Sequence, residues 1–346
     1  MRALMLRFMR AGWSQQQLIA ALPGFTTCVV IALAAGYAAA QTGAPPMLCA
    51  LLVGTALHYL SEEIRTAPGV VFCVRVVLRL GVGLLGARIT AAEIAALGWP
   101  SALIVITAVA TTLLCGLALA KRLGLSTQMG VLAGGATAIC GASAALAIAA
   151  VLPKDKALER DTLAVVVLAT LLSTLAMLVY PLVAQHLGLS PTAAGLFLGA
   201  TIHDVAQVVV AGYTLGPEAG NTAAIVKLSR VALLAAVVAG VVCAFRNKHD
   251  RDEAQGSGEL PPLVPSFLIL FLLLALFQST VGLSPRVQSS LNDLSNACLL
   301  MGVAALGMKT SFAAIARAGW RQAALMLGTT AWIGAVVLVA VAWRMH

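Results

Sequence analysis

The sequence predicts an all-α polytopic membrane protein from three observations. Hydrophobic residues make up 60% of the 346 residues, charged residues only 10%, and the mean hydropathy is +0.97. Soluble globular domains carry about 25% charged residues. The apolar runs are also long and continuous rather than short and alternating, which favours helices over the strands of a membrane barrel. We therefore expect a single transmembrane domain over residues 1–346.

Apolar runs of about 20 residues can cross a hydrocarbon core of about 30 Å as helices. About 9–11 membrane segments are expected, with the candidates Phe25–Gln41, Pro45–Leu60, Gly69–Gly86, Trp99–Lys121, Gln128–Leu152, Leu163–Gln185, Ala193–Tyr213, Ala223–Phe245, Leu263–Val281, Val287–Gly307 and Arg321–Arg344. Residues 1–24 are expected to form an amphipathic segment at the membrane surface. The charged stretch 246–262 is expected to be a solvated loop.

An internal repeat runs through the chain. "GVGLLGARITAAEIAALGW" (81–99) aligns without gaps to "GVAALGMKTSFAAIARAGW" (302–320), with nine of nineteen positions identical. The copies are seven membrane segments apart in this assignment, and an odd offset gives them opposite orientations. This pattern predicts an inverted repeat, with copies near 67–121 and 285–344, as in many secondary transporters.

Composition and motifs exclude several classes of protein. The net charge of +9 does not indicate nucleic acid, because most Lys and Arg lie near segment ends, where they orient a membrane protein. The seven cysteines lie in apolar segments without a CxxC pair, so neither a disulfide framework nor a metal site is expected. A Walker loop, HExxH and GxSxG are absent from the sequence, so we expect no enzyme, no cofactor and a secondary transport cycle.

The stretch "GGATAICGASA" (134–144) holds glycines and polar residues inside an apolar segment. Glycine destabilises helix interiors, so a helix that unwinds near the middle of the membrane is expected here. The freed amides after Cys140 would form the N-terminus of a half-helix, which attracts anions. The alternative is close helix packing through small residues. The candidate substrate-binding residues are Gly135, Thr137, Cys140, Gly141 and Ser143.

A weaker echo, "GATIHDVAQ" from Gly199, contains ionisable groups that are costly inside a membrane. His203, Asp204 and Gln207 are candidates for coupling or gating, with Thr201 in support. The alternative is a His–Asp hydrogen bond that fixes two helices. The two stretches are either broken crossing helices or re-entrant hairpins that enter from opposite faces, and only hairpins suit inverted symmetry.

Embedded cations form the third set of candidates. Arg79 lies near the middle of its segment, and Lys227 lies in "NTAAIVKLSR". A surplus of embedded positive charge favours an anionic substrate, to which both residues are assigned. Arg75, Asn221 and Arg230 are assigned supporting roles, with snorkelling to the membrane surface as the alternative for the cations.

The four stretches "LRLGVGLLGARIT", "GGATAICGASA", "LGATIHDVAQVVVAG" and "NTAAIVKLSR" together resemble the bacterial YeiH-like inner-membrane proteins, the sulfate exporter family. The resemblance covers nearly the whole chain. That family is similar to the group of cation/proton antiporters and bile-acid-type symporters. This likeness implies inverted repeats, unwound membrane segments and a mobile core domain moving against a more static one. The second glycine-marked stretch departs from the group's pattern, because it comes only two segments after the first.

Three functions remain open at this point. The first is a secondary transporter, an exporter, of a small oxyanion such as sulfite, sulfate or an organosulfonate, with protons as a candidate coupling ion. The second is a cation/proton antiporter in which Asp204 is the exchange site. The third is a membrane sensor or assembly partner that transports nothing. The expected partners are the bilayer of the inner membrane, a small inorganic or organic anion, protons and a second copy of the chain in a homodimer, but no nucleic acid.

Overall fold

The protein is helical throughout the part of the chain that a computed structural model describes. That part comprises residues 15–90, 92, 95, 97–153, 156–249, 266–309 and 319–345, and it contains no strand. Seven of its helices are long and apolar enough to cross a membrane, namely Gln16–Thr42, Ala67–Ala87, Gly98–Arg122, Ala157–His186, Pro217–Phe245, Pro285–Lys309 and Trp320–Trp343. The prediction of an all-α polytopic membrane protein is confirmed.

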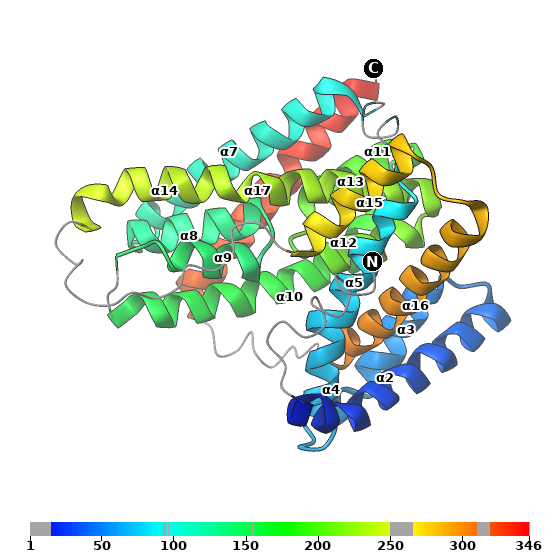
Figure 1. Ribbon diagram of the computed structural model, residues 1–346. Coiled ribbons are helices and arrows are strands. Elements are labelled where there is room, and N and C mark those ends of the chain that lie inside the picture. The colour runs from blue at the N-terminus through cyan, green and yellow to red at the C-terminus, as the bar shows by residue number, and fades with distance from the viewer. Residues whose placement is uncertain are drawn as a thin grey trace. The chain divides into compact units, whose positions relative to one another are not determined.

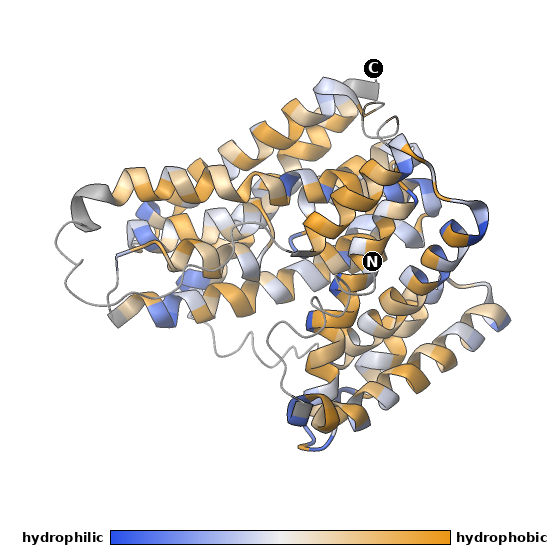
Figure 2. Cartoon of the chain, viewed as in Figure 1, coloured by the Kyte–Doolittle hydropathy of each residue, from blue (hydrophilic) through white to orange (hydrophobic). Residues whose placement is uncertain are grey.

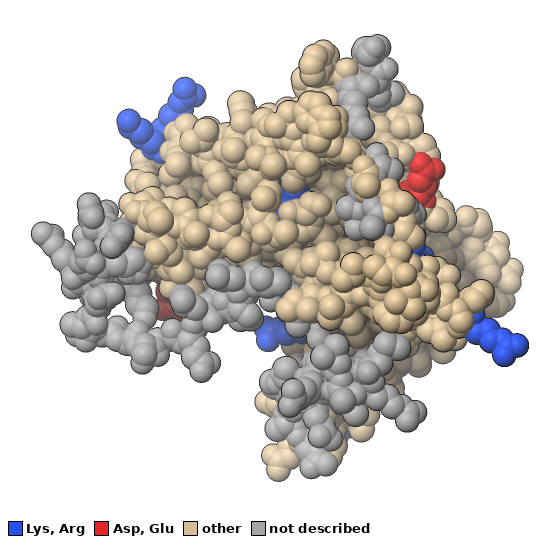
Figure 3. Space-filling view, turned by 45° about the horizontal axis from the view of Figure 1, so that its top comes forward, with Lys and Arg blue, Asp and Glu red and all other residues tan. Residues whose placement is uncertain are grey.

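Polar residues gather at helix ends, whereas the helix bodies are apolar (Figure 2). The described residues on the face drawn in Figure 3 are mostly neither Lys or Arg nor Asp or Glu. Large apolar side chains such as Leu33, Leu114 and Leu182 are 70%, 65% and 64% exposed. An exposed apolar surface of this extent is what lipid contact requires.

The chain divides into two compact units. The first comprises Met1–Ala96 and Pro265–Ser311, and the second comprises Leu97–Val264 and Phe312–His346. Each unit is therefore assembled from two separate stretches of the sequence. The single transmembrane domain stays a prediction, since two compact units can belong to one membrane domain.

The first unit contains the N-terminal helices and two helices from late in the chain (Figure 1). Its elements are α2 (Gln15–Thr42), α3 (Pro46–Ala56), η1 (His58–Ser61), α4 (Ala67–Phe72), the π-helical turn η2 (Cys73–Val77), α5 (Leu78–Leu84), η3 (Leu85–Ala87), α15 (Ser266–Thr280) and α16 (Pro285–Lys309). Helix α2 begins ten residues before Phe25, so residues 15–24 of the predicted amphipathic segment belong to it; residues 1–14 lie outside the described part of the chain.

The two copies of the repeat pack against each other in this unit. Ser295 Oγ donates to the carbonyl of Gly81 at 2.8 Å, and Arg88 Nε donates to Asn292 Oδ1 at 3.0 Å. A Cβ on Gly302 would lie 2.5 Å from Leu78 Cβ. Residue numbers fall along α16 as they rise along α5 and η3, so the two copies run antiparallel. This is the geometry that an inverted repeat requires.

The same relation extends to the neighbouring helices. The repeat offset is 221 residues (302 minus 81). A Cβ on Gly86 would overlap the backbone of Phe271 in α15, and one on Gly307 would overlap the backbone of Leu51 in α3. Subtracting this offset from 271 gives position 50, so the repeat relates Phe271 of α15 to the residue before Leu51 in α3. Helices α3 and α15 thus take equivalent places beside the two copies, and glycine allows the close approach in both.

The second unit contains the two glycine-marked stretches. Its elements are α7 (Gly98–Arg122), α8 (Thr127–Ala138), α9 (Ala142–Ala149), α10 (Lys156–His186), α11 (Pro191–Thr201), α12 (Val205–Thr214), α13 (Pro217–Ala232), α14 (Leu234–His249) and α17 (Trp320–Met345). Helix α14 extends to His249, so the start of the predicted charged loop is helical, and residues 250–262 of that loop lie outside the described part.

Helices α8 and α9 form a re-entrant hairpin rather than a broken crossing helix. A Cβ on Gly135, near the end of α8, would overlap the side chain of Ile148, near the end of α9. Gln128 Nε2, at the start of α8, donates to the carbonyl of Pro153, beyond the end of α9, at 3.3 Å. A continuous helix, at about 1.5 Å per residue, would separate the first pair by about 20 Å and the second by about 38 Å. The chain therefore enters and leaves on the same side.

Helices α11 and α12 form a second hairpin. Thr192 Oγ1, at the start of α11, donates at 2.8 Å to Glu218 Oε1, which follows the end of α12. Gly199 of α11 packs on Val226, and Gly212 of α12 packs on Gly220, so both arms lie along α13 in opposite directions. This hairpin also returns to the side from which it starts.

The two hairpins enter from opposite ends of the second unit. The first ends beside the N-terminus of α10 and the second begins just after its C-terminus, while α10 itself is long enough to cross the membrane. In Figure 1, α8 and α9 lie at one end of this unit and α11 and α12 at the other, with α10 and α13–α14 running along its length. Of the two arrangements open from the sequence, the structure has the hairpins.

Candidate functional site

The tips of the two hairpins meet near the middle of α10. The first tip is Ile139–Gly141 and the second is Ile202–Asp204. A Cβ on Gly141 would lie 3.4 Å from His203 Cβ and 3.7 Å from Ala169 Cβ on α10. The two glycine-marked stretches, about 60 residues apart in sequence, thus form one polar centre in an apolar unit. We call this centre the hairpin junction.

Lys227 of α13 joins the two tips. Its Nζ donates to the carbonyl of Ile139 at 2.6 Å and to that of Ile202 at 2.8 Å. These residues are the C-caps of α8 and α11, so the ammonium bonds the equivalent carbonyl of each hairpin. Lys227 is fully buried. It compensates the negative ends of two helices whose last carbonyls have no helical partner.

Arg230, one turn further along α13, caps the same two helix ends. Nε and Nη2 donate to Ala138 at 2.9 and 2.6 Å, and Nη2 also donates to Thr137 at 2.8 Å. Nη1 donates to Gly199 at 3.2 Å and to Ile202 at 3.3 Å. These five bonds go to backbone carbonyls, and a guanidinium has five N–H groups. Arg230 therefore bonds the carbonyls of the two hairpins, and these bonds occupy its side chain.

Side chains of α10 and α17 complete the junction. Thr137 Oγ1 lies 3.0 Å from Thr329 Oγ1, and His203 Nε2 lies 3.0 Å from Thr330 Oγ1. On α10, Ser173 Oγ accepts from the amide of Asp204 at 2.9 Å, and Thr174 Oγ1 accepts from Gln207 Nε2 at 2.8 Å. Sequence reasoning did not single out Ser173, Thr174, Thr329 or Thr330. The feature of the sequence that could have identified them is a pair of consecutive hydroxyl residues near the middle of an apolar span, in α10 and again in α17.

The helix ends at the junction fall into two groups. The C-termini of α8 and α11 are buried and bonded to Lys227 and Arg230. The N-termini of α9 and α12 lie at a more accessible place, where Ser143 is exposed and Asp204 is half-buried. Gly141, the N-cap of α9, provides no side-chain bond to the first amides of that helix. Asp204 caps α12 by accepting from the amide of Ala206 at 2.8 Å.

The junction carries a surplus of positive charge. Among the described residues, neither Lys227 nor Arg230 forms an ion pair, so neither has a carboxylate within 4.0 Å there. A helix terminus contributes about half an elementary charge, so the two C-termini and two N-termini roughly cancel. With both side chains protonated, the two cations against the single carboxylate of Asp204 leave a surplus of roughly one positive charge.

Two buried polar atoms at the junction are poorly satisfied within the described part of the chain. Gln207 Oε1 has no hydrogen-bond partner there, and His203 Nδ1 makes no bond of standard geometry, although the backbone of Thr137 and Thr201 lies close to its ring. Both side chains are fully buried. Unpaired polar groups are uncommon in protein interiors, because each costs about 1–3 kcal/mol. A bound ligand or water would satisfy them.

The predicted glycines have two different roles. Gly135 lets α9 pack on α8, since a Cβ there would overlap Ile148. Gly141 makes the turn at the hairpin tip, where its φ of 62° and ψ of −123° are unfavourable for residues with a side chain. The packing alternative therefore describes Gly135, and the unwinding hypothesis describes Gly141.

The remaining candidate residues either lie away from the junction or lie at the junction with their side chains buried. Thr201 is buried and donates to the carbonyl of Phe197 at 2.6 Å. Asn221 accepts from the hydroxyl of Tyr213 at 2.7 Å near the start of α13. Cys140 occupies the tip of the first hairpin and is almost completely buried. Arg75 and Arg79 belong to the first unit, where both side chains are exposed.

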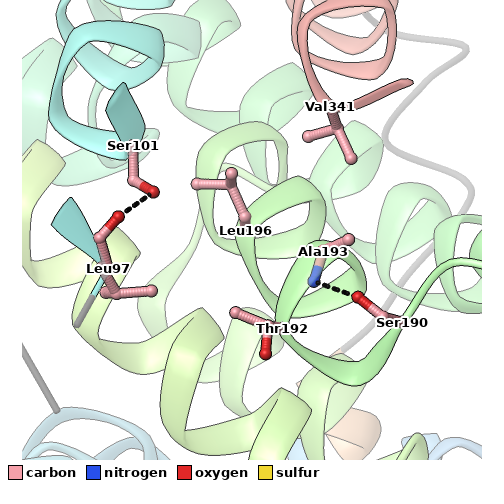
Figure 4. Close-up of a pocket in the computed structure, with 7 residues that line it drawn as sticks. All are labelled: Leu97, Ser101, Ser190, Thr192, Ala193, Leu196 and Val341. Atoms are coloured by element: carbon pink, nitrogen blue, oxygen red, sulfur yellow. Dashed lines mark hydrogen bonds between the residues drawn. The ribbon is translucent and has the colours of Figure 1, made fainter. Parts of the chain in front are cut away.

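A pocket of about 220 Å³ opens at the start of α11, between the beginning of α7 and the end of α17 (Figure 4). Its lining residues are Leu97, Ser101, Ser190, Thr192, Ala193, Leu196 and Val341. Ser101 Oγ donates to the carbonyl of Leu97 at 2.6 Å, and Ser190 Oγ accepts from the amide of Ala193 at 3.3 Å. No ionisable side chain lines it, so the junction is the stronger candidate site.

The helical spans and the paired hairpins define a class of multi-pass membrane protein with a charged centre between two re-entrant loops. The chain belongs to the family described as Conserved hypothetical protein 698, which matches residues 23–326. This confirms the resemblance on which the YeiH-like assignment was based. The chain is a multi-pass protein of the bacterial inner membrane.

Curated relatives share nearly the whole chain. A UPF0324 membrane protein of Chlorobaculum tepidum is 45% identical over 93% of this chain and 89% of its own length. The UPF0324 membrane protein TauZ of Paracoccus denitrificans is 47% identical over 92% of this chain and 94% of its own. A UPF0324 membrane protein of Corynebacterium glutamicum is 29% identical over 91% and 90%. No solved structure matches the chain.

Proposed function

We propose that this protein is a secondary transporter, acting as an exporter, of a small oxyanion such as sulfite, sulfate or an organosulfonate. The observation that carries the proposal is the surplus positive charge at the hairpin junction, next to the start of α9, where Gly141 provides no side-chain cap. Re-entrant hairpins entering from opposite sides are also typical of secondary transporters, whose substrates bind at discontinuous helices near the bilayer midplane.

The anion binds at the accessible N-terminus of α9 in this proposal. The amides that follow Gly141 and the hydroxyl of Ser143 provide its hydrogen bonds. Lys227 and Arg230 act through their charge and by fixing the tips, since their bonds go to backbone carbonyls. His203 and Asp204 adjoin this place and are the proposed residues for gating or proton coupling. Arg79 remains a proposed substrate residue on the first unit, because an exposed arginine in the middle of a span is costly against lipid.

Flux from proteoliposomes tests the proposal. Vesicles loaded with labelled sulfate or sulfite are diluted into anion-free buffer with and without an imposed pH gradient. We expect protein-dependent efflux of at least one oxyanion, and a loss of efflux in Gly141→Ala with a smaller change in Leu146→Ala, an exposed position further along α9. Robust sodium or proton exchange without flux of any oxyanion would contradict the proposal.

A cation/proton antiporter is the second candidate, and a specific observation favours it. Asp204 is half-buried beside the junction and is the single carboxylate in its two tips. Asp204→Asn removes the charge but keeps the cap of α12, since Asn is as good an N-cap as Asp. An antiporter loses its proton-linked exchange in this variant, whereas an anion exporter retains oxyanion flux with an altered pH dependence.

A further inference from the structure

The carbonyls at the hairpin junction form a cage for a cation. Ile139 and Ile202 point their carbonyls at one atom, Lys227 Nζ, from the ends of two half-helices. Thr137, Ala138 and Gly199 direct theirs to Arg230 from the same two ends. In transporters with discontinuous helices, carbonyls at half-helix C-termini and in unwound turns are the groups that coordinate the coupling Na⁺.

The position that a coupling ion would use is therefore filled by a side chain of the protein. The N–O distances of 2.6 and 2.8 Å are those of charge-assisted hydrogen bonds. Lys227 reaches the cage from α13, a continuous helix, whereas the carbonyls belong to the two hairpins. A tethered ammonium compensates the helix ends as a bound ion would, but it cannot dissociate and be transported.

We infer that Lys227 is a resident cation that takes the place of a coupling sodium ion, so that the hairpin junction is complete without Na⁺. The consequence for transport rests on the proposed function, but the consequence for stability does not. A carrier with this junction draws on protons or on the gradient of its own substrate, because its carbonyl cage offers no vacant position to a metal cation.

Arg230 makes the cage specific for a side chain of limited size. Its guanidinium bonds the carbonyls of Thr137, Ala138 and Gly199. It shares the Ile202 carbonyl with Lys227 and leaves the Ile139 carbonyl to Lys227. Replacing Lys227 by alanine removes three methylene groups and the ammonium, which together correspond to n-propylammonium. An external amine of that size should therefore restore the bonds that the variant lacks.

Chemical rescue of Lys227→Ala tests the inference on purified full-length protein. We expect the variant to melt at a lower temperature than wild type. Ammonium and n-propylammonium should raise its melting temperature saturably, because they bind the folded state alone. Tetramethylammonium, which has no N–H donor, should not. Lys309→Ala, at the exposed end of α16 in the first unit, is the matched control and should show no such rise.

Wild-type protein provides the second measurement, which remains available if Lys227→Ala can be purified only in the presence of the amine. Its melting temperature should be unchanged when Na⁺, Li⁺ or K⁺ replaces N-methylglucamine at constant ionic strength. Specific stabilisation of wild type by Na⁺, or melting of Lys227→Ala that no amine raises, would overturn the inference. Rescue without flux of any oxyanion would uphold the cage and count against the proposed function alone.

Discussion

Arg230 is the residue on which the meeting of the two hairpins most depends. Replacing it with methionine keeps much of the side-chain volume and removes every donor. The carbonyls of Thr137, Ala138 and Gly199 then lose the guanidinium that bonds them, while Ile202 retains Lys227. The perturbation therefore leaves three buried acceptors without that donor and changes little else in the packing.

The expected magnitude follows from those three carbonyls. Each buried acceptor that loses its donor costs about 1–3 kcal/mol, so the loss is roughly 3–9 kcal/mol. Removing a buried cation also relieves its desolvation, which moves the expectation to the low end, about 3 kcal/mol. This is a large part of a typical total of about 5–15 kcal/mol. At about 2 °C per kcal/mol, the melting temperature should fall by roughly 6 °C.

Thermal unfolding in detergent, followed by intrinsic fluorescence, measures this effect. Arg122→Met, at the exposed end of α7, is the control, and should stay within about 0.5 kcal/mol of wild type. Arg230→Lys should fall between the two, since one ammonium cannot reach both sets of carbonyls. If Arg230→Met has the same melting temperature as the Arg122→Met control, the guanidinium does not hold the hairpins together and the reasoning fails.

Two further predictions concern the hairpins. Gly141→Ala should destabilise the protein by about 1–3 kcal/mol and abolish flux, because a φ of 62° is strained for alanine and His203 lies against this position. The control is Gly188→Ala, which has a similar φ of 61° but lies in open space. It should keep wild-type flux in the same assay. Cysteines introduced at Thr127 and Ala150, the two ends of the first hairpin, should both react with a membrane-impermeant thiol reagent from the same side of the membrane. A cysteine at Leu187 should react from the other side. Labelling of Thr127→Cys and Ala150→Cys from opposite sides would show a crossing helix instead.

The positions of the membrane segments could be predicted closely from the sequence, because hydropathy decides them. Trp99–Lys121 became Gly98–Arg122, and Arg321–Arg344 became Trp320–Met345. The predicted segment Phe25–Gln41 starts ten residues later than α2, which contains Pro23 and Gly24 in its N-terminal half. Here α2 continues through both, and Gly24 lies against Gly69 of α4, where a side chain would overlap the backbone.

The direction of the glycine-marked segments could not be predicted, because an in-and-out hairpin and a crossing helix need the same apolar residues. Contacts such as Gly135 with Ile148 decide it, and these depend on tertiary structure. The same limit applies to the cations. Sequence identified Lys227 and Arg230 as embedded charges, but their partners are backbone carbonyls, which no side-chain pattern encodes. A sequence therefore does not distinguish an embedded cation that binds an anionic ligand from one that bonds the carbonyls at a helix C-terminus.

Protection of a cysteine at Ser143 tests the central claim, that the junction binds an anion, most directly. Ser143→Cys is labelled with a thiol reagent in the presence of sulfate, a small organosulfonate or chloride at constant ionic strength, beside Leu146→Cys on the exposed face of the same helix. The account predicts that at least one oxyanion slows the labelling of Ser143→Cys saturably and leaves Leu146→Cys unchanged. Equal labelling of Ser143→Cys in every anion would contradict it.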